Sequence, residues 1–318
     1  YRHRLVSLRA GQESGYFFLQ PVLDALTYAA DVGVDVLNLS FFVDPWLFNC
    51  PQNVRDTPAE QAEQRGVIAA VGRALDHAHA RDVTIVGALG NEHADLANAT
   101  ADVASPVYPP GSSRNRWVDD SCLSVPAELD HVVGVVGVGP SGKKGDYSNH
   151  GEGVADLAAP GGYLRDLHGT AGYLDRANMV LAPYPAGAAA ARGLVGASGE
   201  PTGPEVVRDC AGGSCAYYAY LQGTSMAAPH VAGVAALVVS RSGRPDPDRA
   251  GMRMAPDAVE AVLRATARDV PCPGRVVSYA AETRPTAYDA LCVGDPARNS
   301  VYGEGIVDAA AAVGARSG

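Results

Sequence analysis

Residues 223–233 read Gly-Thr-Ser-Met-Ala-Ala-Pro-His-Val-Ala-Gly and are the most informative string of this sequence. Small residues surround Ser225 at the point where a loop becomes an apolar helix. Pro229 follows within what we expect to be the first helical turn, where a missing N–H costs little. The free N–H groups and the dipole of a helix N-terminus stabilise negative charge. A serine nucleophile needs such an environment, because its attack creates an oxyanion beside it. The plain structural alternative is that Ser225 only caps the helix.

The whole string resembles the nucleophile signature of the subtilisin-like serine peptidases (subtilases), and further blocks match that family in its own order. These blocks are residues 34–40 (Val-Asp-Val-Leu-Asn-Leu-Ser), 86–91 (Val-Gly-Ala-Leu-Gly-Asn), 132–138 with 147–151 (Tyr-Ser-Asn-His-Gly), 159–161 (Ala-Pro-Gly) and 302–309 (Tyr-Gly-Glu-Gly-Ile-Val-Asp-Ala). The resemblance implies an α/β fold with three layers, in which helices flank both faces of a mostly parallel sheet. Residues 1–318 would form one partial catalytic domain without the N-terminal strands of the family.

Hydrophobic periodicity supports the same architecture independently. Val-rich runs at 34–39, 83–88, 132–138 and 154–158 predict buried strands, and residues 20–31, 59–80, 225–240 and 256–267 predict helices. Alternating strands and helices indicate parallel strands with right-handed crossovers. Ligand sites in such sheets lie beyond the carboxyl ends of the strands, where Ser40, Asn91 and Ser225 are expected.

The resemblance gives Ser225 the role of nucleophile and Asn91 the role of side-chain donor to the oxyanion, with the backbone N–H of Ser225 as second donor. A Ser nucleophile attacks the scissile carbonyl and forms an acyl-enzyme. The alternative for Asn91 is an ordinary turn residue after a strand.

Two short segments match the substrate-binding segments of the family. Ser40, Phe41 and Phe42 would pair with substrate residues that precede the cut, and Ala88, Leu89 and Gly90 would form the facing wall. Subtilases usually have Gly at the position of Phe42 and Ala at the position of Leu89. We therefore expect narrow subsites that prefer small or slender residues just before the cut.

The Asp and His motifs of a subtilase triad are absent before residue 38. The string His168-Gly-Thr comes after Ala-Pro-Gly, out of family order, and His230 is expected to be a packing histidine because five residues separate it from Ser225. The sequence starts at Tyr1, and residues 4–9 read as a strand that follows the catalytic His in subtilases. We therefore expect an upstream segment of the same protein to carry Asp and His. Without it, the sheet would have a gap with two unpaired edges, and residues 1–318 alone would be poorly stable and inactive.

Three other interpretations of the sequence imply different classes of protein. An α/β-hydrolase needs Gly-x-Ser-x-Gly and a His downstream of the nucleophile, but Ala227 stands at the last Gly and only His230 follows. A catalytically inactive subtilase-like binding or scaffold module is the non-enzymatic alternative, which an intact Ser225 string and Asn91 disfavour. A two-chain enzyme, nicked before Tyr1, stays open.

Charge and cysteines limit the setting. The 318 residues carry a formal net charge of −10, which disfavours nucleic-acid and anionic-membrane partners, and the longest apolar runs are too short to span a bilayer. No cofactor, zinc or calcium signature is evident, so peptide or protein substrates are the expected partners. Six cysteines allow fifteen pairings. From the positions of the cysteines in expected loops, we predict the pairs Cys50–Cys122, Cys210–Cys215 and Cys272–Cys292. Paired cysteines in loops fit a secreted, extracellular protein.

Two segments are longer than the compact family pattern requires, residues 41–63 and 162–220. Both leave strand ends on the expected active-site side. They either shape substrate access or form inert surface loops, and the sequence leaves these alternatives open.

Overall fold

Four parallel strands form the central sheet in the computed structural model, which describes residues 3–247 and 251–314. The strands β1 (Val36–Leu39), β2 (Thr84–Ala88), β5 (Val132–Val138) and β6 (Leu157–Pro160) lie in the order β1-β2-β5-β6. Their carboxyl ends therefore meet at one edge of the sheet, where the segments after β1, β2 and β5 begin. The predicted α/β architecture with a mostly parallel sheet is confirmed.

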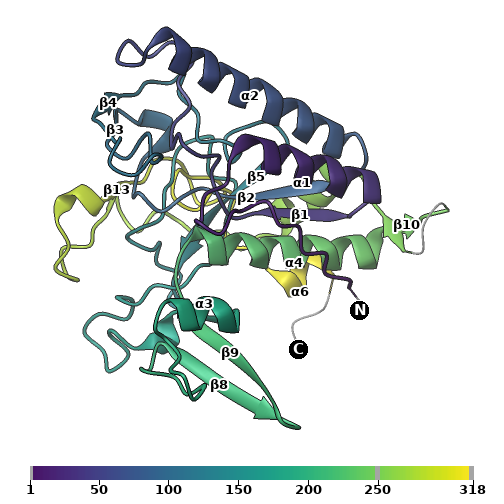
Figure 1. The fold of residues 1–318 in the computed structure, drawn as a ribbon, viewed down its shortest axis with the longest axis vertical. Helices are drawn as coiled ribbons and strands as arrows, with labels where there is room; N and C mark the ends of the chain where they lie inside the picture. The colour runs from purple at the N-terminus through teal and green to yellow at the C-terminus, as the bar shows by residue number, and fades with distance from the viewer. Residues whose placement is uncertain (1–2, 248–250, 315–318) are drawn as a thin grey trace.

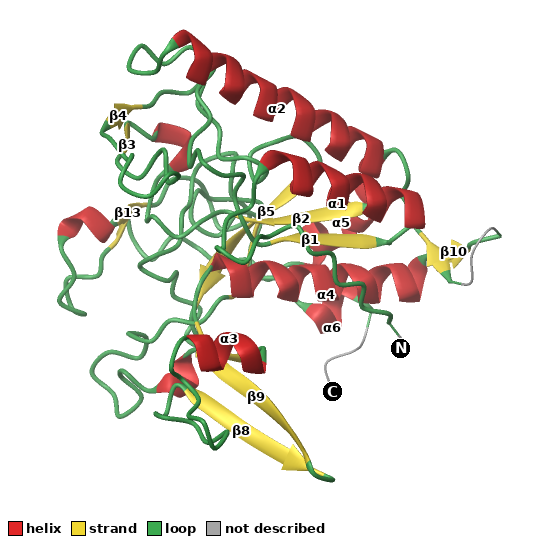
Figure 2. Cartoon of the chain, in the orientation of Figure 1, coloured by secondary structure: helices red, strands yellow, loops and turns green. Residues whose placement is uncertain are grey.

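Helices cover both faces of this sheet (Figures 1 and 2). On one face α1 (Leu19–Val32) and α2 (Pro58–His79) share an apolar core with Leu39 and Ile85. On the other, α4 (Thr224–Ser242), α5 (Pro256–Thr266) and α6 (Ala309–Ala312) pack against β2, β5 and β6. Successive strand residues point to opposite faces, so a strand buried on both sides needs the near-continuous apolar runs seen here.

The helix boundaries follow local sequence signals. The helix α1 ends at Gly33, which adopts φ 70° and donates its N–H to the carbonyls of Ala29 and Ala30. The helix α2 begins after Thr57, whose side chain accepts the N–H of Glu60 while the Glu60 carboxylate accepts the N–H of Thr57. The four predicted helices are confirmed to within two residues at each end.

The segment at 162–220, for which the sequence analysis predicted no strand or helix, contains regular secondary structure. Here β7 (Val180–Pro183), β9 (Ser214–Leu221) and β8 (Val206–Ala211) form an antiparallel sheet in the order β7-β9-β8, which extends from the main body in Figure 1. The helix α3 (Ala186–Ala191) packs on it through Ala189. The hairpin was missed because its tyrosines and alanines do not alternate clearly between polar and apolar.

Short pairs and single turns complete the described part of the chain. They are β3 (Ala101–Asp102) with β4 (Arg116–Trp117), β10 (Arg244–Pro245) with β11 (Met252–Arg253), β12 (Val276–Val277) with β13 (Ala290–Leu291), and 3-10 turns at Leu96–Asn98, Arg176–Asn178 and Thr286–Tyr288. All three predicted disulfides, Cys50–Cys122, Cys210–Cys215 and Cys272–Cys292, are present.

Two strand predictions were wrong. Residues 4–9 form no strand, and Leu5 is 100% exposed, since no neighbouring strand in the described chain offers this segment a partner. The strand predicted at 154–158 begins only at Leu157, because Val154 and Ala155 donate their N–H groups to Gly151 in a turn. None of the described helices is long and apolar enough to cross a membrane.

Candidate active site

Ser225 is the second residue of α4, and Gly223 rather than Ser225 is the residue that caps this helix. The N–H of Thr224 donates to the side chain of Asn91, and the N–H groups of Met226 and Ala227 donate to the Gly223 carbonyl. Ser225 is the one early residue of α4 whose N–H has no acceptor within the described residues. This N–H therefore remains available to a negatively charged atom near the Ser225 side chain.

Pro229 lies inside α4, beyond the first turn where the sequence placed it. A proline has no N–H, so the carbonyl of Ser225, four residues earlier, loses its helical partner. The hydroxyl of Ser40, at the end of β1, replaces it and donates to this carbonyl at 3.1 Å. In return the Ser225 hydroxyl donates to the Ser40 carbonyl at 3.3 Å. Pro229 thus ties the start of α4 to the end of β1.

Asn91 follows β2 and lies beside Ser225, although the two are far apart in sequence. Its Oδ1 accepts the Thr224 N–H at 2.9 Å and the Thr224 hydroxyl at 3.2 Å. Since Oδ1 faces these donors, the Nδ2 group is left to donate elsewhere, and Asn91 is exposed. Thr224 Oγ1 also accepts the N–H of Gly90 at 3.0 Å, which fixes the turn after β2 against α4.

Asn149 braces this turn, a role that the sequence gave no means of assigning. Its Oδ1 accepts the N–H groups of Glu92 and Ala94, and its Nδ2 donates to the Leu89 carbonyl and to Glu92 Oε2. Gly90 has φ 106°, and a Cβ there would lie 2.4 Å from Asn149 Nδ2. In the sequence, the one signal for Asn149 was its place in the Tyr-Ser-Asn-His-Gly string, and that string does not indicate which residues Asn149 contacts.

An open cleft of about 380 Å³ begins at Ser225. It is lined by residues 15–17, 40–42, 44, 47, 88, 90–92, 107, 124, 224 and 225. The segment at 41–63 therefore contributes to the cleft wall. Phe41 stacks on Phe17 with ring centroids 4.3 Å apart, and Phe42 packs against the core around Leu47 and Phe48. Leu89 does not line the cleft, because it is fully buried and packs over Gly134.

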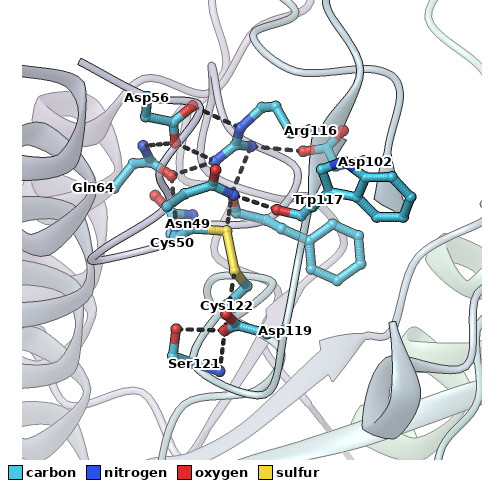
Figure 3. The surroundings of a disulfide bond; sticks show 12 residues. Asn49, Cys50, Asp56, Gln64, Asp102, Arg116, Trp117, Asp119, Ser121 and Cys122 are labelled. Carbon is cyan, nitrogen blue, oxygen red and sulfur yellow. Dashed lines mark hydrogen bonds and ion pairs between the residues drawn. A yellow bond between two sulfur atoms is a disulfide. The ribbon is translucent and has the colours of Figure 1, made fainter. Parts of the chain in front are cut away.

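The Cys50–Cys122 disulfide and the buried side chain of Arg116 stabilise the segment at 41–63, which contributes to the cleft wall (Figure 3). Arg116 is fully buried and donates to Asp56 at 2.7 Å and to Asp102 at 2.8 Å, with both carboxylates also fully buried. Its guanidinium also donates to Gln64 and to the Phe48 carbonyl and lies over the Trp46 ring. These contacts join α2, β3 and β4 behind the cleft.

The histidines lie away from this constellation. His168 is exposed and contacts the Tyr173 ring, while His230 is exposed and hydrogen-bonds through Nδ1 to the Met226 carbonyl at 2.8 Å. The expectation that His230 is a packing histidine was therefore wrong. Within the residues described, no imidazole hydrogen-bonds to Ser225, and no group of three or more His, Cys, Asp or Glu side chains is placed to hold a metal ion.

Two curated proteins are similar in sequence. The chain is 33% identical over 148 residues, 46% of its length, to an extracellular protease of Xanthomonas campestris pv. campestris. It is 25% identical over 238 residues, 75% of its length, to a thermophilic serine proteinase of Bacillus sp. strain AK1. The chain spans 17% and 36% of the lengths of these two relatives.

Solved structures share the fold. A lanthipeptide protease matches with a TM-score of 0.58 and 24% identity over 96% of this chain and 68% of its own. The epidermin leader-peptide-processing serine protease of Staphylococcus aureus matches with a TM-score of 0.55 and 18% identity over 96% and 57%. Residues 2–305 also match the model of the subtilase family, peptidase S8, and the chain therefore belongs to the subtilase family.

Proposed function

We propose that the protein is a secreted serine endopeptidase that hydrolyses peptide bonds through an acyl-enzyme on Ser225. The observation that carries this proposal is the bond from Thr224 N–H to Asn91 Oδ1, which spans 133 residues of sequence. It holds two groups in the arrangement that acyl transfer needs: a hydroxyl at a helix start and a side-chain amide with a free N–H beside it.

Each group has a defined part in the reaction. Ser225 Oγ attacks the scissile carbonyl, and the carbonyl oxygen becomes an oxyanion. The N–H of Ser225 and Asn91 Nδ2 donate to that oxyanion. Substrate residues preceding the cut lie between Ser40, Phe41 and Phe42 on one side and Ala88 and Gly90 on the other, while the Leu89 side chain between them points into the core.

The reaction also requires a base that accepts the proton of the Ser225 hydroxyl as Oγ attacks. In this structure that hydroxyl donates to the Ser40 carbonyl instead. We assign this base, a His, and its Asp partner to an upstream segment of the same protein. On this assignment residues 1–318 alone are inactive. Three disulfides and the extracellular relative support secretion.

The test is to label the protein with a fluorophosphonate, which reacts with activated serines, and to measure casein hydrolysis in parallel. The preparations compared are residues 1–318 and the longer natural protein with its upstream segment. We expect labelling and hydrolysis only in the longer protein, with both abolished by Ser225→Ala and retained by Ser198→Ala, a matched exposed serine. Hydrolysis that survives Ser225→Ala would refute the assignment, and a longer protein that neither labels nor cleaves would favour a binding module.

A further inference from the structure

Two carboxylates line the same cleft as Ser225. Asp44 comes from the segment after β1 and is 6% exposed, and Glu92 directly follows Asn91 and is partly buried. They come from the two different segments that follow β1 and β2. The cleft thus carries two acidic groups as well as its nucleophile.

Neither carboxylate has a cationic partner in the described part of the chain. Asp44 Oδ2 accepts the Phe17 N–H at 2.5 Å, and Asp44 Oδ1 has no partner there. Glu92 Oε2 accepts the Asn91 N–H and an Asn149 N–H, both at 2.8 Å. None of the residues lining the cleft is an Arg or a Lys.

Three other buried carboxylates of this protein are paired with arginine, whereas buried Asp166 accepts only N–H and O–H donors from Ser141 and Leu167 among the described residues. Asp56 and Asp102 are paired with Arg116, and Asp146 is paired with Arg284. An unpaired carboxylate away from water costs considerable free energy unless a cation approaches it. Burial accordingly raises the pKa of both Asp44 and Glu92 above the ordinary range, and no cation offsets it. A positive charge that enters the cleft would therefore meet two carboxylates that no cation of the described residues offsets.

The remaining lining suits a long cationic side chain. Ser124 is 5% exposed, lines the cleft, and has a hydroxyl with no hydrogen-bond partner among the described residues. The stacked rings of Phe17 and Phe41 provide an apolar and aromatic wall. Aliphatic stems pack on such surfaces while the charged head seeks carboxylates and hydroxyls.

We propose that this cleft binds the lysine or arginine side chain that precedes the scissile bond, with Asp44 and Glu92 as the specificity-determining residues. This deepens the proposed function and rests on it, since the cleft is a substrate subsite only if Ser225 cuts peptides.

The first experiment measures binding without catalysis, on the natural full-length protein. Isothermal titration compares benzamidinium, a planar cation, with benzamide, its neutral counterpart of nearly the same shape. We expect benzamidinium to bind at least tenfold more tightly, and Asp44→Asn to weaken it about tenfold, or about 1.4 kcal/mol. Benzamide affinity should not change. An asparagine oxygen still accepts the Phe17 N–H, so the substitution preserves the fold.

Asp120→Asn is the matched control, because Asp120 is exposed and does not line the cleft. Equal affinities for benzamidinium and benzamide, or an unchanged benzamidinium affinity in Asp44→Asn, overturn the proposal. Repeating the titration with Glu92→Gln against the exposed control Glu152→Gln tests the second carboxylate in the same way.

The second experiment measures kcat/KM on peptides that differ only in the residue before the cut: Lys, Arg, Leu or Phe. We expect Lys or Arg to be preferred at least tenfold, and Asp44→Asn to reduce that preference about tenfold. Efficient cleavage with a Leu or Phe preference would overturn this proposal and leave the proposed function standing. Tight benzamidinium binding without any cleavage would overturn the proposed function and leave the cleft standing as a cation-binding site.

Discussion

The three disulfides should contribute very unequally to stability, because they close loops of very different length. Cys50–Cys122 spans 72 residues, Cys272–Cys292 spans 20 and Cys210–Cys215 spans 5. A crosslink restricts the unfolded chain more when the loop is longer. The loop-entropy relation gives about 4.4, 3.3 and 2.1 kcal/mol respectively. Replacing Cys50 and Cys122 together by Ala should therefore cost about 2 kcal/mol more than replacing Cys210 and Cys215.

Equilibrium urea unfolding of the full-length protein measures the difference, with the denaturant slope checked for each variant. Cys50 and Cys122 are buried, whereas Cys210 and Cys215 are exposed, so loss of sulfur packing adds to the first variant only. Comparing the reduced variant with the reduced unsubstituted protein isolates that packing contribution. Equal losses of stability from the two pairs, after this correction, would refute the loop-entropy reasoning.

Three further results are expected. Asn91→Ala should lower kcat by about 10² to 10³ with little change in KM, because the free N–H of Asn91 donates to the oxyanion in the proposed reaction. The exposed control Asn115→Ala should change kcat less than twofold. A loss of kcat below tenfold for Asn91→Ala in peptide hydrolysis assays would remove Asn91 from that role. Arg116→Ala should cost about 3–5 kcal/mol in urea unfolding because Asp56 and Asp102 stay buried, whereas Arg176→Ala at a half-exposed ion pair should cost at most about 1 kcal/mol, and similar losses would contradict this reasoning. Burial raises the pKa of Glu128 from 4.5 to about 7, so the folded state binds the proton more tightly and stability falls as pH rises from 4.5 to 7; Glu128→Gln should abolish this fall, on the order of 3 kcal/mol, and an unchanged pH profile in thermal melts would count against it.

The strands and helices around the sheet could be predicted because each carries its own pattern. The strand at 132–138 and the four long helices have apolar periodicity and end signals within a few residues. The three disulfide pairs were predicted from the loop positions of the cysteines, although the sequence alone allowed fifteen pairings. The structure of residues 4–9 could not be predicted, because a strand forms only beside a neighbouring strand and the local sequence does not show whether one is present.

The candidate site was predicted only in part. Ser225, Asn91 and Ser40 lie in recognisable strings, and the structure brings them together. Asp44 gave no signal, because its importance comes from which residues face it. The role of Pro229 was also misplaced, since it frees the Ser225 carbonyl, which then accepts a hydrogen bond from the Ser40 hydroxyl 185 positions away.

Local sequence was enough to predict the parallel α/β architecture and the helix start that carries Ser225, because periodicity, turn residues and motifs are local properties. The tertiary structure was needed to select one of the fifteen cysteine pairings, and to show that Thr224 orients Asn91, that Asn149 braces the turn after β2, and that Asp44 and Glu92 share a cleft. Burial and charge pairing depend on contacts between segments far apart in the chain, and folding alone establishes them.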